Sequence, residues 1–336
     1  MGSEATGMGA AAAGAGAADT DAADAGAAEV GRGTGAGIGR ERWLPEFVAL
    51  SAIWGASFAL IKVGVDAGLP PVWVALWRCL FGALALLGFC AVLRVRLPRD
   101  PMTWAHASVI AALLNSVPFT LLAFGEQRVS SVLAGMLNAT TPLATLLFGL
   151  ALMPAERLTR WRLAGLVIGF LGVACLLGVW RGGALGGATL GGALACLAAT
   201  LCYGAGFSYT RRWYAGRDGS AAALSALQIG LATVQLALVA PWLAGLPHWP
   251  GPPAALAMVV LGALGTGYAY ILNLRVIRVA GSTMAASVTY LTPVWSTAIG
   301  AWLLSEPVGW NTLLGAAILV AGIALSRRRG KPRSGP

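Results

Sequence analysis

The chain has 336 residues, of which 57% are hydrophobic and only 11% are Asp, Glu, Lys or Arg. Soluble domains give about a quarter of their residues to these four types, so the composition excludes an ordinary soluble protein. A net charge of +10 would suit nucleic acid, but the basic residues stand in short loops between apolar segments, as they do in membrane proteins. We therefore expect a lipid bilayer as a partner, and no nucleic acid.

Residues 1–40 are mostly Ala and Gly, with scattered acidic residues. Such a segment cannot bury a core, which predicts a disordered cytoplasmic tail. It also lacks a basic stretch followed by an apolar core, so a secretory signal is not expected. Residues 327–336 form a second, basic tail that is also expected to be cytoplasmic.

From residue 46 to residue 326 the chain divides into ten apolar segments, each about as long as a helix that crosses a bilayer. Pro, Gly, Arg or Asp mark the breaks between them. The alternating pattern of an outer-membrane barrel is absent, so the segments are predicted to be helices. The expected spans are 46–65, 71–93, 103–125, 130–152, 163–180, 187–210, 221–244, 254–274, 282–304 and 310–326.

The basic residues predict how these helices are oriented. With the N-terminus inside, nearly all Lys and Arg residues outside the spans fall on the cytoplasmic side, and only Arg128 and Arg181 fall on the other. This bias predicts that both termini are cytoplasmic. The abundance of Ala, Gly and Arg is typical of a GC-rich bacterial gene, so we expect a bacterial inner-membrane protein.

The second half of the apolar region repeats the first at a spacing of about 150 residues. Because each repeat has an odd number of helices, the two copies insert with opposite orientation, which is typical of secondary transporters. We therefore predict an all-α integral membrane protein with ten transmembrane helices in two inverted five-helix repeats, at 41–181 and 182–326. The matching pairs are Trp54-Gly55-Ala56-Ser57-Phe58 with Tyr203-Gly204-Ala205-Gly206-Phe207, Thr141-Pro142 with Thr292-Pro293, and Glu156, Gly165 and Gly172 with Glu306, Gly315 and Gly322.

Three patterns along the chain resemble the EamA family of the drug/metabolite transporter superfamily. They are Trp54-Gly55-x-x-Phe58 with Lys62 and Arg78, the run from Gly125 to Gly135 followed by Asn138-Ala139-Thr140-Thr141-Pro142, and Glu306-Pro307 with Gly315 and Gly322. The resemblance covers about residues 43–326. It implies ten helices in two inverted bundles and export of small metabolites, often amino acids or related compounds. It also implies a central cavity surrounded by helices one, three, four, six, eight and nine.

Lys62 and Arg78 are the basic residues that lie inside predicted spans. Placing such a charge in a membrane costs a few kcal/mol, which marks both as candidates for binding an anionic group such as a substrate carboxylate. Lys62 also has an alternative role, because it lies only a few residues from a span end. Its long side chain would then reach the lipid headgroups.

Aromatic and polar side chains within the spans form a second candidate set for substrate binding. The alternative for each of them is packing or hydrogen bonding between helices without ligand contact. The residue pattern gives Trp54, Phe58, Tyr203 and Phe207, and the family resemblance adds Asn115, Phe119, Asn138, Tyr268, Asn273 and Tyr290.

Pro118, Pro142 and Pro293 lie within apolar spans, where proline interrupts the hydrogen bonds of a helix. As hinges they would let parts of helices move during gating. As static kinks they would have no role in transport.

Several kinds of chemistry have no signature in this sequence. The five cysteines lie in apolar stretches and form no C-x-x-C pair, so neither a disulfide framework nor a metal site is expected. Nucleophile motifs and ATP-binding loops are absent as well, so we expect no enzyme and no cofactor.

The acidic residues nearest the predicted spans all stand near span ends. Proton coupling would therefore require a carboxylate at the end of a helix, and without such a group the protein would be a uniporter. These acidic residues are Glu46, Asp66, Glu126, Glu156 and Glu306.

The sequence thus predicts a carrier that exports a small-molecule substrate across the inner membrane by alternating access. Assembly as a homodimer is left open. The alternatives are a non-transporting scaffold or sensor subunit, and a channel. The duplication favours the carrier, because inverted copies provide two equivalent gates.

Overall fold

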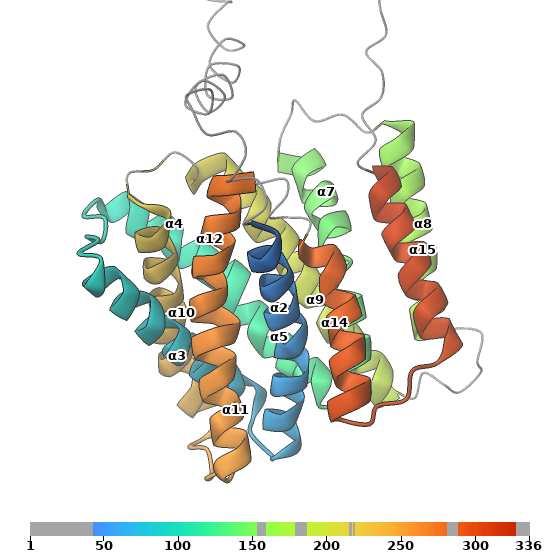
Figure 1. Ribbon diagram of the computed structural model, residues 1–336, viewed down its shortest axis with the longest axis horizontal. Helices are drawn as coiled ribbons and strands as arrows, with labels where there is room; N and C mark the ends of the chain where they lie inside the picture. The colour runs from blue at the N-terminus through green and yellow to red at the C-terminus, as the bar shows by residue number, and fades with distance from the viewer. Residues whose placement is uncertain are drawn as a thin grey trace, which may run out of the picture. The chain divides into compact units, whose positions relative to one another are not determined.

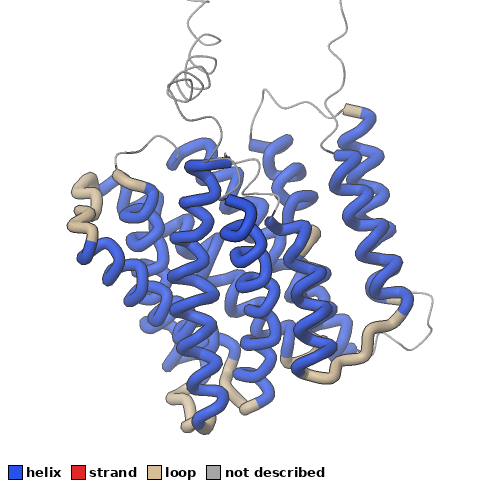
Figure 2. Tube along the Cα trace, in the orientation of Figure 1, coloured by secondary structure: helices blue, strands red, loops and turns tan. Residues whose placement is uncertain are grey.

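The computed structural model describes residues 43–152, 159–178, 187–214, 217, 219–280 and 288–326. Within these ranges the chain forms helices and loops but no strand, as Figure 2 shows. Eight helical segments of this part are long and apolar enough to cross a membrane, and Trp310–Leu325 is a shorter apolar helix. The prediction of an all-α membrane protein is confirmed. The two predicted tails, with Glu156 and Arg181, lie outside the described residues.

The helices begin and end close to the predicted spans, and several spans consist of two or three consecutive helices (Figure 1). Elements labelled η are π-helices. In chain order the elements are α2 (Trp43–Asp66), α3 (Pro71–Val92), α4 (Pro101–Ala111), η1 (Ala112–Ser116), α5 (Val117–Glu126), α6 (Ser131–Asn138), α7 (Thr141–Leu152), α8 (Arg160–Leu177), α9 (Gly187–Tyr209), η2 (Thr210–Tyr214), α10 (Ala221–Ala244), α11 (Pro252–Gly262), η3 (Ala263–Tyr268), α12 (Ala269–Ala280), α14 (Val288–Leu303) and α15 (Trp310–Ser326).

Proline and capping side chains start several of these helices. Pro71 and Pro252 occupy the first turns of α3 and α11, where the missing N–H group would have no helical partner in any case. Asp100 caps α4 by accepting hydrogen bonds from the backbone N–H groups of Met102 at 3.2 Å and Thr103 at 3.0 Å. The helix boundaries therefore follow from local chemistry as well as from hydropathy.

Two spans are interrupted by a π-helix at the same distance from the start of the span. In one, α4 runs for 11 residues before η1, and in the other α11 runs for 11 residues before η3. A π-helix has more residues per turn than an α-helix. The side chains that follow it therefore point in a different direction from the one that a continuous α-helix would give them.

Helices α8 and α15 lie side by side (Figure 1) and touch through glycine. A Cβ atom on Gly172 would lie 2.7 Å from the backbone N of Leu319 and 3.1 Å from the carbonyl oxygen of Gly315. Farther along the same contact, a Cβ atom on Gly322 would lie 2.8 Å from the carbonyl oxygen of Gly165. The two backbones are too close for a side chain at these positions, as is common between membrane helices.

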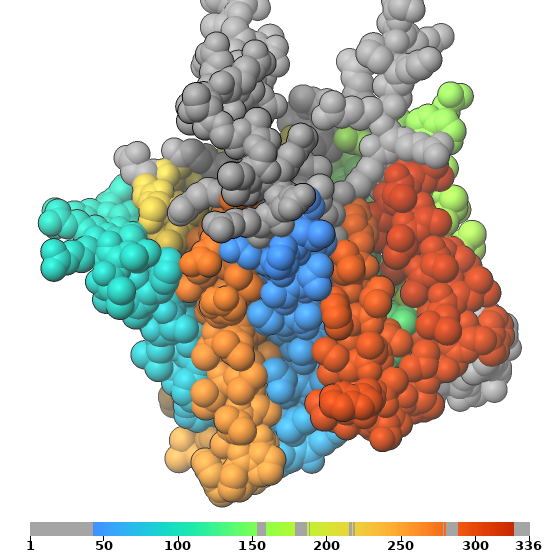
Figure 3. Space-filling view, viewed as in Figure 1, coloured from blue at the N-terminus to red at the C-terminus, as the bar shows by residue number. Residues whose placement is uncertain are grey.

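Similar contacts join α2 to α14 and α9 to α7. A Cβ atom on Gly55 would lie 3.0 Å from the backbone N of Ser296, and one on Gly204 would lie 2.6 Å from the carbonyl carbon of Ala144. Figure 3 shows α2 between α12 and α14 on one face of the bundle.

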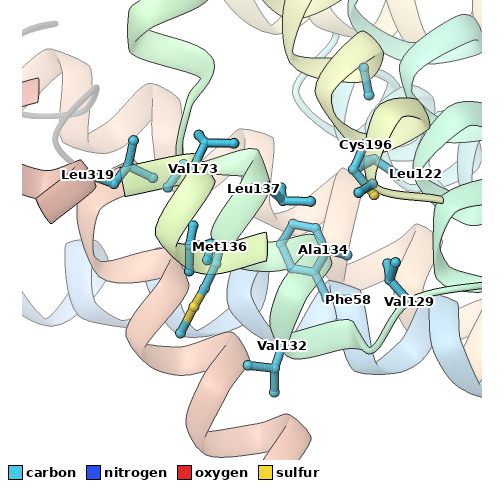
Figure 4. Close-up of a cluster of buried hydrophobic side chains, with 14 of the residues drawn as sticks. Phe58, Leu122, Val129, Val132, Ala134, Met136, Leu137, Val173, Cys196 and Leu319 are labelled. Atoms are coloured by element: carbon cyan, nitrogen blue, oxygen red, sulfur yellow. The ribbon is translucent and has the colours of Figure 1, made fainter. Parts of the chain in front are cut away.

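A buried apolar cluster is formed by side chains of α2, α5, α6, α7, α8, α9 and α15 (Figure 4). Phe58, Leu122, Leu137, Val173 and Leu319 belong to it. Because lipid tails are as apolar as these side chains, such a cluster holds membrane helices together by close packing and not by exclusion of water.

The glycine contact between α8 and α15 predicts that Gly172→Ala lowers stability. The new methyl group would meet backbone atoms of α15, which cannot move aside as a flexible side chain can, so we expect a loss of about 1–3 kcal/mol. The measurement is the thermal unfolding midpoint of the purified protein in detergent. Gly88→Ala is the matched control, because a Cβ atom at Gly88 has no neighbour within 4 Å. Equal midpoints for the two variants would contradict the close contact.

Candidate functional site

Arg78 lies on α3 in the interior of the bundle, with only 8% of its surface exposed. Its Nε–H group donates a hydrogen bond to the Oγ1 atom of Thr266, on η3, at 3.1 Å. Its guanidinium carbon lies 3.8 Å from the centroid of the Phe119 ring, on α5. A hydroxyl and an aromatic face thus replace part of the water that this cation would have outside the membrane.

The hydrogen bonding of Arg78 is incomplete. Among the described residues only its Nε–H group has a hydrogen-bond partner, whereas a guanidinium carries five N–H donors. The terminal NH₂ groups are therefore free to bind a ligand. A carboxylate is the ligand that fits them best, because it accepts two parallel hydrogen bonds from an arginine.

Two tyrosines lie close to Arg78. Tyr203, on α9, and Tyr270, on α12, are both near enough to act on it electrostatically, as is Cys79. The ring of Tyr203 stacks on that of Phe207 with 6.4 Å between centroids. The guanidinium thus contacts Thr266 and Phe119, and two tyrosines lie near it.

Asn115 extends this polar region into η1, where it is fully buried. Its Nδ2 atom donates to the Tyr270 hydroxyl at 3.4 Å, and its Oδ1 atom accepts from Gln228 Nε2, on α10, at 2.6 Å. Two of the π-helices, η1 and η3, thus contribute to the same region, through Asn115 and Thr266. We call the set of Arg78, Asn115, Phe119, Tyr203, Gln228, Thr266 and Tyr270 the central polar cluster.

Lys62 lies away from this cluster, near the end of α2. Its Nζ atom is 3.0 Å from Asp66 Oδ1 and donates a hydrogen bond to the backbone oxygen of Glu126 at 2.9 Å. It therefore links the last turns of α2 and α5. We call this end of the bundle, where α2 and α5 end and α6 begins, the Glu126 end; it is the lower end in Figure 1.

The structure brings together four of the candidates named from the sequence, Arg78, Asn115, Phe119 and Tyr203. The others lie elsewhere or at its edge, and ligand contact remains a prediction for all of them. Phe58 is in the buried apolar cluster of Figure 4, Tyr290 packs against that cluster, and Trp54 packs beside Leu50. Asn138 ends α6 with a buried Oδ1 atom that has no described hydrogen-bond partner, and Asn273 is partly buried on α12. Phe207 and Tyr268 are 48% and 42% exposed.

The three candidate hinges occupy different kinds of position. Pro118 is the second residue of α5, directly after η1, and Pro142 is the second residue of α7, directly after α6 ends. Pro293 is inside α14, where its carbonyl oxygen accepts hydrogen bonds from the hydroxyls of Ser296 and Thr297. Two of the three thus coincide with helix interruptions, and motion at any of them remains a prediction.

Thr266, Tyr270 and Gln228 were not among the candidates. The signal available in the sequence was a polar side chain inside an apolar span. Tyr268, which is among the candidates, ends η3 and is 42% exposed, whereas Tyr270 lies two residues farther on, where η3 has changed the direction of the side chains. In the described part of the chain, no group of three or more His, Cys, Asp or Glu side chains is placed to hold a metal ion.

Residues 43–178 and 190–328 each match the sequence model of the EamA-like transporter family, which confirms the resemblance seen in the motifs. The uncharacterized inner membrane transporter YedA of Escherichia coli K12 is 29% identical over 289 residues, which cover 84% of this chain and 90% of that protein. The aromatic amino acid exporter YddG of Salmonella typhimurium 14028s is 28% identical over 301 residues, covering 82% and 95%. A crystal structure with 22% sequence identity aligns over 86% of this chain and 97% of its own with a TM-score of 0.60, which indicates a shared fold.

The hydrogen bond between Asn115 and Gln228 predicts energetic coupling between these residues. Asn115→Leu and Gln228→Leu should each lower stability, because each leaves the other amide buried without its partner. The double variant should lose less than the sum of the two, by about 0.5–2 kcal/mol. Unfolding of the four proteins in mixed micelles measures this coupling, and strictly additive losses would contradict it.

Proposed function

The chain belongs to the EamA-like transporter family, and from this premise we propose that it exports a small metabolite across the inner membrane by alternating access. The incomplete hydrogen bonding of Arg78 is the observation that carries the proposal. A substrate carboxylate would bind to its terminal NH₂ groups. The rings of Phe119 and Tyr203 would contact the rest of the substrate, which suits an amino acid or a related compound.

Inverted repeats are supported by the contact between α8 and α15. Gly172 touches Gly315, while Gly322 touches Gly165, so residue numbers rise along one helix as they fall along the other. The two helices are therefore antiparallel. In the sequence repeat Gly165 corresponds to Gly315, and Gly172 to Gly322. Replacing each glycine by its equivalent therefore turns one contact into the other, which is what a two-fold axis between inverted copies requires.

Two further observations support the same symmetry. Gly55 packs on Trp295 in α14, and its repeat equivalent Gly204 packs on Ala144 in α7. Ala144 and Trp295 are also equivalent, because each stands two residues after the proline of a Thr-Pro pair, Thr141-Pro142 or Thr292-Pro293. The π-helices η1 and η3 also interrupt spans that correspond in the two halves. With α14 and α15 counted as spans, these relations support ten transmembrane helices in two inverted copies.

Alternating access would use this symmetry to open the central polar cluster to one side of the membrane at a time. The cluster draws residues from both halves, Arg78, Asn115 and Phe119 from the first and Tyr203, Gln228, Thr266 and Tyr270 from the second. Movement of one half against the other would therefore change the shape of the site. The bias of basic residues supports cytoplasmic termini, which places the Glu126 end at the outer face.

Export rather than uptake is favoured by a relative whose name records a direction, the aromatic amino acid exporter YddG. A scaffold or sensor subunit would give no flux in liposomes that contain only this protein. A channel would give a flux that does not saturate in the concentration range of a carrier and shows no counterflow.

Arg78→Ala should reduce export while the protein still inserts and folds. Loss of a charge-assisted hydrogen bond costs about 1.5–3 kcal/mol, which corresponds to roughly a tenfold to hundredfold loss of substrate affinity. The measurement is untargeted metabolite profiling of the medium around cells that overexpress the wild type or the variant. Arg96→Ala, which removes an exposed arginine from the loop after α3, is the matched control.

A compound enriched outside cells with the wild type and with Arg96→Ala, but not with Arg78→Ala, would identify the substrate. Its saturable flux and counterflow in proteoliposomes would then test the carrier directly. Undiminished export of that compound by well-expressed Arg78→Ala would contradict the role of Arg78.

A further inference from the structure

Glu126 is a buried carboxylate at the end of α5. The residue is 0% exposed, and neither Oε1 nor Oε2 has a hydrogen-bond partner among the described residues. Burial of an ionised carboxylate without hydrogen bonds is among the most unfavourable arrangements in a protein. Although Glu126 stands at the end of a helix, its side chain is enclosed by neighbouring parts of the bundle.

Charged side chains from two helices and one loop lie near enough to act on Glu126. They are Lys62 and Asp66 on α2, Arg78 on α3, and Glu306 in the loop between α14 and α15; the thiol of Cys196, on α9, is also close. The positive and negative charges among these neighbours cancel, so an ionised Glu126 would leave one uncompensated negative charge in the enclosed site.

The positive charge of Lys62 already has other partners. Lys62 pairs with the Asp66 carboxylate and donates to the backbone oxygen of Glu126, not to its side chain. The negative charge of Glu306 is held in place by Ser131 N at 2.8 Å, Ser131 Oγ at 2.9 Å and Val132 N at 2.9 Å, at the start of α6. Glu306 thus accepts three hydrogen bonds, whereas the side-chain oxygens of Glu126 accept none among the described residues.

We propose that Glu126 is a proton-binding site, and that the Glu126 end of the bundle closes only over the protonated side chain. Closure takes up one proton from the water at this end, and opening exposes the carboxyl group and releases the proton. A metal ion does not fit the same place, because a hard cation needs several oxygen ligands, and the described residues near Glu126 offer no such group.

The position of Glu126 connects this proton to transport. Lys62 joins α2 to the end of α5, Glu306 joins the start of α6 to the loop before α15, and Gly125 approaches Cys196 of α9. Separation of these elements would open the central polar cluster toward the Glu126 end. This coupling to transport rests on the proposed function, whereas the protonation of Glu126 does not.

Infrared spectroscopy of the protein reconstituted in lipid at neutral pH tests the protonation. A protonated carboxylic acid has a C=O stretching band that a carboxylate lacks, so the wild type should show one such band and Glu126→Gln should lose it. Glu46→Gln is the matched control, because Glu46 forms an ion pair with Arg275 at 3.6 Å, and it should keep the band. Glu126→Asp is a second variant, which should shift the band without abolishing it. A spectrum unchanged by Glu126→Gln would overturn the proposal, whether or not the protein transports.

Distances between spin labels test the link to closure. Gly187→Cys and Trp302→Cys place labels at two exposed positions of the Glu126 end, in a background whose five native cysteines are replaced. Because the closed state holds one more proton, raising the pH should favour the open state, by up to about tenfold in the open-to-closed ratio per pH unit. Glu126→Gln, which is neutral at every pH, should remove this dependence, and the same dependence in Glu126→Gln would overturn the proposed link.

Discussion

A guanidinium inside an apolar helix bundle is the constraint on which the rest of this structure depends. An unpaired charge within a membrane is costly, so Arg78 requires polar groups at a depth where the spans are otherwise apolar. The bundle supplies Thr266 and the face of Phe119 directly, with Asn115, Gln228 and Tyr270 forming hydrogen bonds beside them. This set leaves part of the guanidinium without a partner, and that remainder is what a substrate would bind.

The glycine contacts determine how the bundle around this charge can move. Gly172 and Gly322 bring the backbones of α8 and α15 together, and Gly55 and Gly204 do the same for α2 with α14 and α9 with α7. Backbones in direct contact move as units, since no flexible side chains lie between them. The π-helices η1 and η3 carry Asn115 and Thr266. Rigid helix pairs and irregular segments at the site are the features that a protein opening alternately to two sides would need.

Much of this arrangement could be predicted from the sequence, because the bilayer imposes length and hydropathy on every span. Arg78, Asn115, Phe119 and Tyr203 stood out as charged, polar or aromatic residues within spans. Two other features required the coordinates. The direction of side chains beyond η3 depends on a π-turn that hydropathy does not reveal, and the burial of Glu126 depends on which helices surround it. The pairing of Lys62 with Asp66 was readable in principle, because the two are four residues apart on one helix.

The most direct test of the account is whether the central polar cluster recognises a carboxylate through Arg78. Thermal-shift measurements on the purified protein would compare free amino acids with their methyl esters, which keep the side chain and the amino group but lose the negative charge. The account predicts that at least one free acid raises the unfolding midpoint of the wild type, that its methyl ester does not, and that Arg78→Gln abolishes the effect. Equal stabilisation by acid and ester, or an undiminished effect in Arg78→Gln, would contradict it.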